Sequence, residues 1–203
     1  MASSKRLIMF DIGGVLVNFS ENRYIRYLHK EILPTIPYGK LERFILPLIP
    51  LMDFDALDVP GLERMVAKHF GITGLDLGWV QGYMATARPY KSVIRLFNEI
   101  SSSHRTVLLS NISRSRYAEI HRTYLKGIHP ERVFLSYEMV MRKPDPNIYK
   151  AVLKETGVKP KNALFIDNMI ENVIGAESVG VDSIWFRNYG QLVEELKSFG
   201  VLS

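Results

Sequence analysis

Polar and charged side chains follow several short apolar runs of this 203-residue chain, at the points where the runs end. Asp11 and Asp167 each come directly after such a run, and Ser110 and Asn111 follow another. Lys143 lies in the proline-stiffened segment MRKPDP. Two carboxylates, a hydroxyl and a lysine are what phosphoryl transfer requires: a nucleophile, oxygen ligands for a metal ion, and donors for the phosphoryl oxygens. The alternative is that these polar groups only solvate the edge of a sheet.

These side chains converge only if the apolar runs are strands of one sheet. The runs are continuous rather than alternating, which is typical of parallel strands buried on both faces; they are Leu7–Phe10, Thr106–Leu109, Val133–Leu135, Ala163–Ile166 and Ser183–Phe186. Helical patterns lie between the later runs and after the last one, over residues 92–101, 114–125, 145–157, 172–179 and 191–199. The repeated unit predicts a doubly wound parallel sheet in a three-layer α/β/α fold. In such sheets ligands bind at the carboxyl ends of the strands.

The interval from Val17 to about Arg88 differs, because it contains no comparable strand. Apolar residues repeat there at helical spacing, as on the inward faces of a small bundle; the stretches are residues 20–32, 38–48, 62–70 and 79–84. The sequence therefore predicts a core of residues 1–16 and 89–203 and an α-helical insert of residues 17–88. We expect this insert to close over the strand ends as a cap.

Composition excludes several classes of protein. The chain has 26 Lys and Arg against 21 Asp and Glu, a net charge of +5, but no basic run or nucleic-acid motif, so we expect no nucleic-acid partner. It has no cysteine, which excludes disulfides and cysteine nucleophiles and favours a reducing compartment. The longest apolar stretch, Phe44–Met52, contains two prolines and is half as long as a bilayer span. We expect a cytoplasmic protein with no membrane partner, and we leave its oligomeric state open.

Four segments resemble, in order and spacing, the four motifs of the haloacid dehalogenase-like hydrolase superfamily. They are FDIGGVL at 10–16, LLSN at 108–111, RKPD at 142–145 and FIDNMIEN at 165–172. The Asp-x-Gly first motif and the compact insert look most like the bacterial sugar-phosphate phosphatase branch, whose members act on glucose 1-phosphate. The resemblance implies a Rossmann-like core with a small helical cap. It also implies an enzyme that hydrolyses small phosphorylated metabolites, with sugar phosphates as the expected substrates.

The resemblance assigns a role to each matching residue. Asp11 would attack phosphorus and become an aspartyl phosphate. Ser110 and the backbone N–H of Asn111 would bind the phosphoryl oxygens. Lys143 would neutralise the nucleophile and the charge that develops on the phosphoryl group.

Mg²⁺ is the implied cofactor, and its expected ligands are Asp11, the Gly13 carbonyl and the fourth-motif residues Asp167 and Asn168. Gly13 departs from the family pattern, since most members have a second aspartate there that moves protons, a contribution of roughly 10²–10⁴-fold. Asn168 stands where the second member of an acidic pair usually binds the metal. An amide oxygen can bind Mg²⁺ but brings no charge, so we expect weak Mg²⁺ affinity.

Two other functions stay open. In a metal-independent haloacid dehalogenase the same aspartate would displace halide from carbon; here Met169 and Asn172 stand where that branch has an Asn and an Asp, and Asp167 replaces a serine. In a catalytically silent binding or regulatory protein, Gly13 and Asn168 would be marks of lost activity. P-loop enzymes and Ser-His-Asp hydrolases are excluded, because the chain contains neither GxxxxGK[ST] nor GxSxG.

Overall fold

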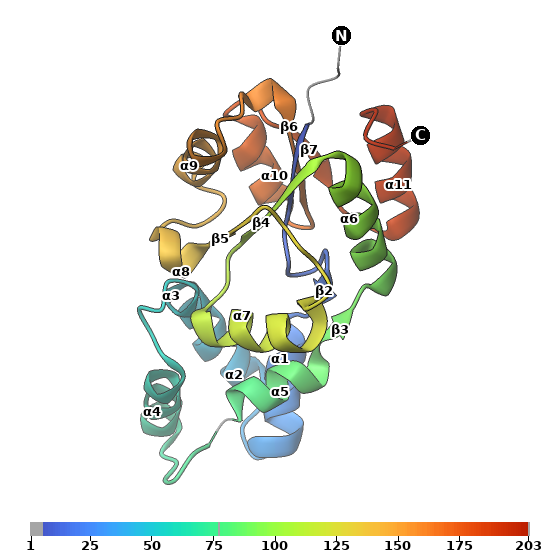
Figure 1. The fold of residues 1–203 in the computed structure, drawn as a ribbon. Helices are drawn as coiled ribbons and strands as arrows, with labels where there is room; N and C mark the ends of the chain where they lie inside the picture. Colours follow the sequence, from blue (N-terminus) through green and yellow to red (C-terminus); the bar gives the residue numbers. More distant parts are fainter. Residues whose placement is uncertain (1–5, 77, 203) are drawn as a thin grey trace.

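A five-stranded parallel sheet forms the centre of the computed structural model, which describes residues 6–76 and 78–202 (Figure 1). The strand order is β5-β4-β1-β6-β7, so β1 lies between the strands that carry the other candidate site residues. All four pairings are parallel. The strands match the predicted runs to within one residue at each end; they are β1 (Leu7–Phe10), β4 (Arg105–Ser110), β5 (Arg132–Leu135), β6 (Ala163–Asp167) and β7 (Asp182–Trp185).

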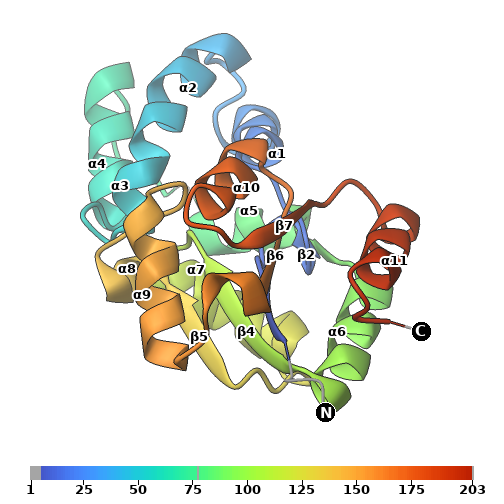
Figure 2. The ribbon, with the colours of Figure 1, turned by 90° about the horizontal axis from the view of Figure 1, so that it is seen from above.

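Helices cover both faces of the sheet, as Figure 2 shows, with α9 and α10 on one side and α6 and α11 on the other. Successive residues of β1 point to opposite faces: Ile8 and Phe10 pack in one buried cluster, and Leu7 and Met9 in the other. The three-layer fold is therefore confirmed. The core helices are α6 (Lys91–Ser103), α7 (Arg114–Ile120) with the π-turn η3 (His121–Leu125), α8 (Ser136–Met139), α9 (Pro146–Thr156), the 3₁₀ turn η4 (Pro160–Asn162), α10 (Ile170–Glu177) and α11 (Tyr189–Ser198).

Capping residues fix the start and end of α9, the helix that follows the candidate lysine. The side chain of Asp145 accepts a hydrogen bond of 2.9 Å from the Asn147 N–H, and Pro146 occupies the first helical position. Gly157 ends the helix with φ +67°, a left-handed backbone that suits glycine. The segment just before α9 is thereby held in place.

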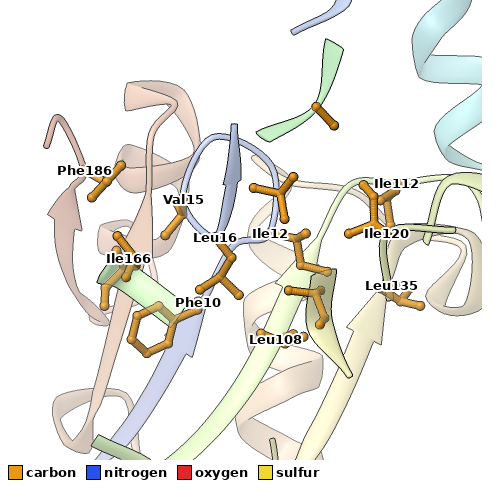
Figure 3. Close-up of a cluster of buried hydrophobic side chains, with 14 of the residues drawn as sticks. Phe10, Ile12, Val15, Leu16, Leu108, Ile112, Ile120, Leu135, Ile166 and Phe186 are labelled. Atoms are coloured by element: carbon orange, nitrogen blue, oxygen red, sulfur yellow. The ribbon is translucent and has the colours of Figure 1, made fainter. Parts of the chain in front are cut away.

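The segment after β1 folds back on itself and packs into the core. Ile12, Val15 and Leu16 are buried in the same cluster as Phe10 (Figure 3). The Ile12 carbonyl accepts hydrogen bonds from the Leu16 and Val17 N–H groups at 3.0 and 2.9 Å. Asp11 therefore stands between a buried strand and a tightly packed loop, which gives its backbone little freedom.

The insert is helical, but it begins and ends with a strand pair that the sequence did not predict. Val17 pairs with Pro89 and Asn18 with Arg88, in antiparallel register, which brings the two ends of the insert together. Two-residue strands have no periodicity to recognise in a sequence. The insert elements are β2 (Val17–Asn18), α1 (Glu21–Tyr27), the π-turn η1 (Leu28–Ile32), α2 (Tyr38–Ile45), the 3₁₀ turn η2 (Leu46–Leu48), α3 (Ile49–Asp53), α4 (Val59–Phe70), α5 (Trp79–Thr86) and β3 (Arg88–Pro89).

One buried cluster runs from the core into the insert without a break. It contains Phe10 and Leu16 of the core and Ile25, Leu41 and Met52 of the insert helices. Figure 1 shows these helices grouped at one end of the molecule, opposite the end where the chain enters β1. None of the helices formed by residues 6–76 and 78–202 is both long and apolar enough to cross a bilayer.

Candidate active site

A pocket of about 390 Å³ lies between the carboxyl ends of the strands and the insert helices. Both parts of the chain line it. The core contributes Asp11, Gly13, Asn111, Arg142, Lys143, Pro144, Asn168, Met169, Glu171 and Asn172, and the insert contributes Phe19, Glu21, Ile49 and Asp53. Of the residues expected to converge, Asp11, Asn111 and Lys143 line this pocket together.

Lys143 lies at the centre of the candidate site and is almost completely buried. Its Nζ is 2.9 Å from Asp11 Oδ1, 2.6 Å from Asp167 Oδ2 and 3.0 Å from the Leu109 carbonyl oxygen. Burial alone lowers the pKa of Lys143, but the charges of the two aspartates outweigh it and raise the pKa above its usual value. Lys143 is therefore a cation at neutral pH, held directly beside Asp11.

The side chain of Asn111 fixes the backbone of Lys143. Its Oδ1 accepts a hydrogen bond of 2.9 Å from the Lys143 N–H, and its Nδ2 donates one of 2.9 Å to the Lys143 carbonyl. The sequence assigned Asn111 only a backbone role toward phosphate. The structure adds a second role, because this amide joins the end of β4 to the segment that carries the lysine.

Asp167 is fully buried, and protein donors already contact both of its oxygens. Oδ2 accepts from Lys143 and from Asn172 Nδ2 at 3.0 Å, while Oδ1 accepts from the Met169 N–H at 2.8 Å. Burial raises the pKa of Asp167 to about 6, against the opposing charge of Lys143. Asp167 is not among the residues that line the pocket. This geometry favours a role in holding Lys143 over the expected role as a direct metal ligand.

Asn168 and Asp11 present the oxygens that a metal ion could use. Asn168 lines the pocket, and its Oδ1 is buried without a hydrogen bond. Asp11 Oδ1 is likewise buried and makes no hydrogen bond, although it lies within ion-pair distance of Lys143. Gly14 has φ +80° and leaves room for the Asn168 side chain. A Cβ on residue 14 would lie only 2.4 Å from Asn168 Nδ2. Hard oxygen donors of this kind fit Mg²⁺, with water completing the shell.

Of the two side chains that present oxygens for a metal ion, only Asp11 carries a charge. In the part of the chain that the structure describes, no three His, Cys, Asp or Glu side chains come together as a metal-binding group. Asn168 is the reason at this site, because an acid in its place would add a third carboxylate beside Asp11 and Asp167. Weak Mg²⁺ affinity stays a prediction.

Ser110, like Asp167, is buried away from the pocket. It ends β4 and is 1% exposed, and it is not among the residues that line the pocket. Phe10 is level with Leu108 in the sheet, so Asp11 and Ser110 occupy neighbouring levels of adjacent strands. The phosphate-binding role of Ser110 stays a prediction.

Phe19 fills the space where a side chain at position 13 would stand. A Cβ on Gly13 would lie 2.6 Å from Cζ of the Phe19 ring, closer than any real contact of this kind. Three other carboxylates line the pocket, on Glu21, Asp53 and Glu171. The proton-transfer group that Gly13 lacks must therefore come from elsewhere in the pocket, from substrate or from solvent.

We expect Gly13→Asp to lower the free energy of unfolding by about 1–3 kcal/mol, because the new side chain collides with a packed ring. Urea unfolding would measure this, with Gly39→Asp as the control, since a Cβ at Gly39 meets nothing within 4 Å. In the double variant Gly13→Asp, Phe19→Ala, the loss should be smaller than the sum of the single losses. A Gly13→Asp protein as stable as the wild type would show that Phe19 does not occupy this space.

Sequence reasoning did not single out Asp53 or Asn172 as contributors to the site. Asn172 lies in the first turn of α10, five residues after Asp167, and is buried with its amide on that carboxylate. Asp53 ends α3, a helix that the apolar pattern did not predict, because the predicted stretch of residues 38–48 stops before it. Only the position of Asn172 within FIDNMIEN was a signal, and nothing in the sequence marked Asp53.

Phosphatases are among the known proteins to which the chain is similar. The chain is 22% identical over 183 residues to the sesquiterpene phosphatase astK of Aspergillus oryzae, which covers 89% of each protein. It is 37% identical over 65 residues to a glyceraldehyde 3-phosphate phosphatase of Pyrococcus furiosus, a match that covers 32% of this chain and 27% of that one. Both relatives are named as phosphatases.

Solved structures share the fold over almost the whole chain. The HAD family enzyme bt-2542 of Bacteroides thetaiotaomicron superposes with a TM-score of 0.80 at 22% identity, covering 94% of this chain and 99% of that one. Another structure of the same enzyme, with a TM-score of 0.77, is a complex with magnesium and inorganic phosphate. Residues 5–180 match the haloacid dehalogenase-like hydrolase family, described as a hydrolase family. The chain therefore belongs to the haloacid dehalogenase-like hydrolases.

Proposed function

We propose that this chain is a Mg²⁺-dependent phosphatase that hydrolyses small phosphorylated compounds through an aspartyl phosphate on Asp11. One observation carries the proposal: Asp11 stands in a pocket at the end of the central strand with the Lys143 cation 2.9 Å away. The phosphatase relatives support it. The proposal includes the division into a core of residues 1–16 and 89–203 and a cap of residues 17–88, and a cytoplasmic location.

In this proposal Asp11 supplies the nucleophilic oxygen. A bond forms between that oxygen and phosphorus as the bond from phosphorus to the leaving oxygen breaks, and the leaving oxygen takes up a proton from solvent. Water then attacks the same phosphorus, which releases phosphate and restores the carboxylate. Lys143 keeps its proton throughout and offsets the negative charge in both steps. Mg²⁺, when bound, adds positive charge at the phosphoryl oxygens.

The ligands proposed for Mg²⁺ are Asp11, Asn168 and the Gly13 carbonyl. Asp167 lies behind Lys143 and holds that lysine in place. We expect Asn168→Asp to lower the Mg²⁺ dissociation constant by roughly tenfold, because a charged oxygen binds a cation more strongly than an amide dipole. Calorimetric titration with Mg²⁺ measures this without reference to activity. Asn147→Asp, in the exposed first turn of α9, is the matched control. Unchanged or weaker binding in Asn168→Asp would mean that this side chain does not contact the ion.

Two classes of substrate are proposed for this pocket. The resemblance to sugar-phosphate phosphatases favours a sugar phosphate, especially one whose leaving group needs little protonation. A phosphate ester with an apolar group is the second candidate, because Phe19, Ile49, Pro144 and Met169 line the pocket. The name of the sesquiterpene phosphatase relative supports this second class.

A screen of sugar, nucleotide, acyl and isoprenoid monophosphates, with and without Mg²⁺, tests the proposal by released phosphate. We expect Mg²⁺-dependent release from at least one class and inhibition by fluoride. Metal-independent release of halide from 2-haloacids would instead support the dehalogenase alternative. Binding of these compounds without turnover of any of them would support the silent binding protein.

A further inference from the structure

Asp53 ends helix α3 of the insert and contacts three separate elements of the core. Its Oδ1 accepts a hydrogen bond of 3.0 Å from Arg116 Nη2 on α7, and its Oδ2 is 3.4 Å from Arg142 Nη2. Its backbone carbonyl accepts a hydrogen bond of 2.6 Å from Ser136 Oγ, at the start of α8. Asp53 is 4% exposed and Arg116 is 3% exposed, so the ion pair between them is shielded from water. Asp53 of the insert thus contacts α7, the start of α8 and the segment that contains Arg142.

Two routes lead from Asp53 to the candidate lysine. The shorter one passes through Arg142, which directly precedes Lys143 and lines the pocket. The longer one passes through Ser136, whose Oγ also accepts a hydrogen bond of 3.0 Å from the Ile112 N–H. Ile112 directly follows Asn111, the residue whose amide fixes the backbone of Lys143.

The segment that carries Lys143 needs such anchors. It begins at Val140, a β-branched residue with φ +52°, and a side chain of this type rarely adopts that backbone. Backbone strain of this kind persists only where surrounding contacts hold the chain. Val140 itself is 79% exposed, so its own side chain contributes little to holding it. We infer that the contacts of Arg142 and Lys143, which closely follow Val140 in the chain, hold this backbone in place.

Both oxygens of the Asp53 side chain face arginines, and this limits what the residue can do. A carboxylate between two guanidinium groups is held in place by charge, although burial raises the pKa of Asp53 above its usual value. Loss of its charge would leave the buried Arg116 without its nearest buried partner, since the second acid near it, Glu21, is 3.7 Å from Nη1 and one-third exposed. Asp53 is therefore suited to fixing geometry.

We propose that Asp53 is a positioning residue: it couples the seating of the insert over the pocket to the placement of Lys143 beside Asp11. This inference rests on the proposed phosphatase function. When the insert is seated, Asp53 holds Arg142 and, through Ser136 and Asn111, the backbone of Lys143. Loss of these contacts would loosen the lysine segment.

The test compares Asp53→Asn with Asp55→Asn in the full chain. Asp55 also joins the insert to α7, through Arg114 at 3.4 Å, but it does not line the pocket, and its side-chain hydrogen bond and ion pair both go to Arg114. We expect Asp53→Asn to lower kcat by about 10–100-fold with a KM change of less than about threefold, since a displaced Lys143 weakens transition-state contacts more than binding. Asp55→Asn should keep kcat within about twofold.

Hydrogen exchange separates positioning from plain stability. We expect amide exchange over residues 140–146 to quicken by at least about fivefold in Asp53→Asn and to stay unchanged in Asp55→Asn. Asp53→Glu, which keeps the charge, should recover part of both effects. If Asp53→Asn does not fold, Arg142→Gln replaces it, because it removes the shorter route while leaving the buried Arg116 pair intact.

Two results would overturn the inference. One is a folded Asp53→Asn protein whose kcat and exchange over residues 140–146 both match those of Asp55→Asn. The other is an Asp53→Glu protein as impaired as Asp53→Asn, with loop exchange at the wild-type rate in both. Hydrogen exchange does not depend on turnover, so it tests the link between Asp53 and the lysine segment even if the wild type hydrolyses no phosphate ester. Absence of hydrolysis by the wild type would contradict the proposed function and not the role of Asp53.

Discussion

Asp11→Asn should reduce kcat for phosphate release by at least about 10⁴-fold. The amide has nearly the same shape as the carboxylate, but its oxygen is a poor nucleophile and carries no charge. No second carboxylate stands at the end of β1 to replace it, because the next three residues are Ile12, Gly13 and Gly14. Phosphate release with the best substrate from the screen measures the loss.

The fold should survive this substitution, which makes the activity loss interpretable. Lys143 keeps its 2.6 Å contact with Asp167, so the buried lysine retains one counter-ion. Asp182→Asn is the matched control, because Asp182 is exposed at the start of β7, at the opposite end of the sheet. Turnover of Asp11→Asn within about tenfold of the control, in a folded protein, would remove Asp11 from the reaction.

Lys143→Ala should lower kcat/KM by roughly 10²–10³-fold, the usual cost of losing one group that stabilises transition-state charge. The same change should lower the free energy of unfolding by about 3–5 kcal/mol, because it leaves the buried carboxylates of Asp11 and Asp167 without their shared cation. Kinetics and urea unfolding at the same temperature measure the two effects separately. Lys150→Ala, exposed on α9, is the control.

Loss of stability could by itself lower activity, so the assay is run only where circular dichroism shows a folded protein. Under those conditions, a kcat of Lys143→Ala within a factor of about three of the control would contradict the assignment. It would also contradict the proposal for Asp53, which acts through this lysine.

Strand positions were the part of the fold that the sequence predicted best. Continuous apolar runs such as Leu7–Phe10 and Ala163–Ile166, in a chain where helices alternate with them, indicate buried parallel strands. Because the strands are parallel, the residues that follow them, Asp11 and Asp167, lie at the same edge of the sheet. The antiparallel pair of Val17–Asn18 with Arg88–Pro89 escaped prediction because it is two residues long. A strand of two residues is too short to show a periodic pattern of apolar side chains.

The roles of individual site residues were harder to predict, because motif spacing does not give side-chain direction or burial. Asp167 and Asn168 are adjacent in sequence, yet Asp167 points to Lys143 beneath the pocket while Asn168 lines it. Phe19 lies over Gly13 only because the chain folds back after β1. Asp53 reaches the lysine segment across a junction between distant parts of the chain, which no local pattern encodes.

The most direct test of the central claim is a crystal structure of the protein grown with Mg²⁺ and beryllofluoride, which mimics a phosphoryl group on a carboxylate. The account predicts one BeF₃⁻ group bonded to a carboxylate oxygen of Asp11, with Lys143 Nζ within hydrogen-bond distance of a fluorine. An adduct on any other residue would contradict it. A pocket that stays free of beryllofluoride at saturating Mg²⁺ would also contradict it.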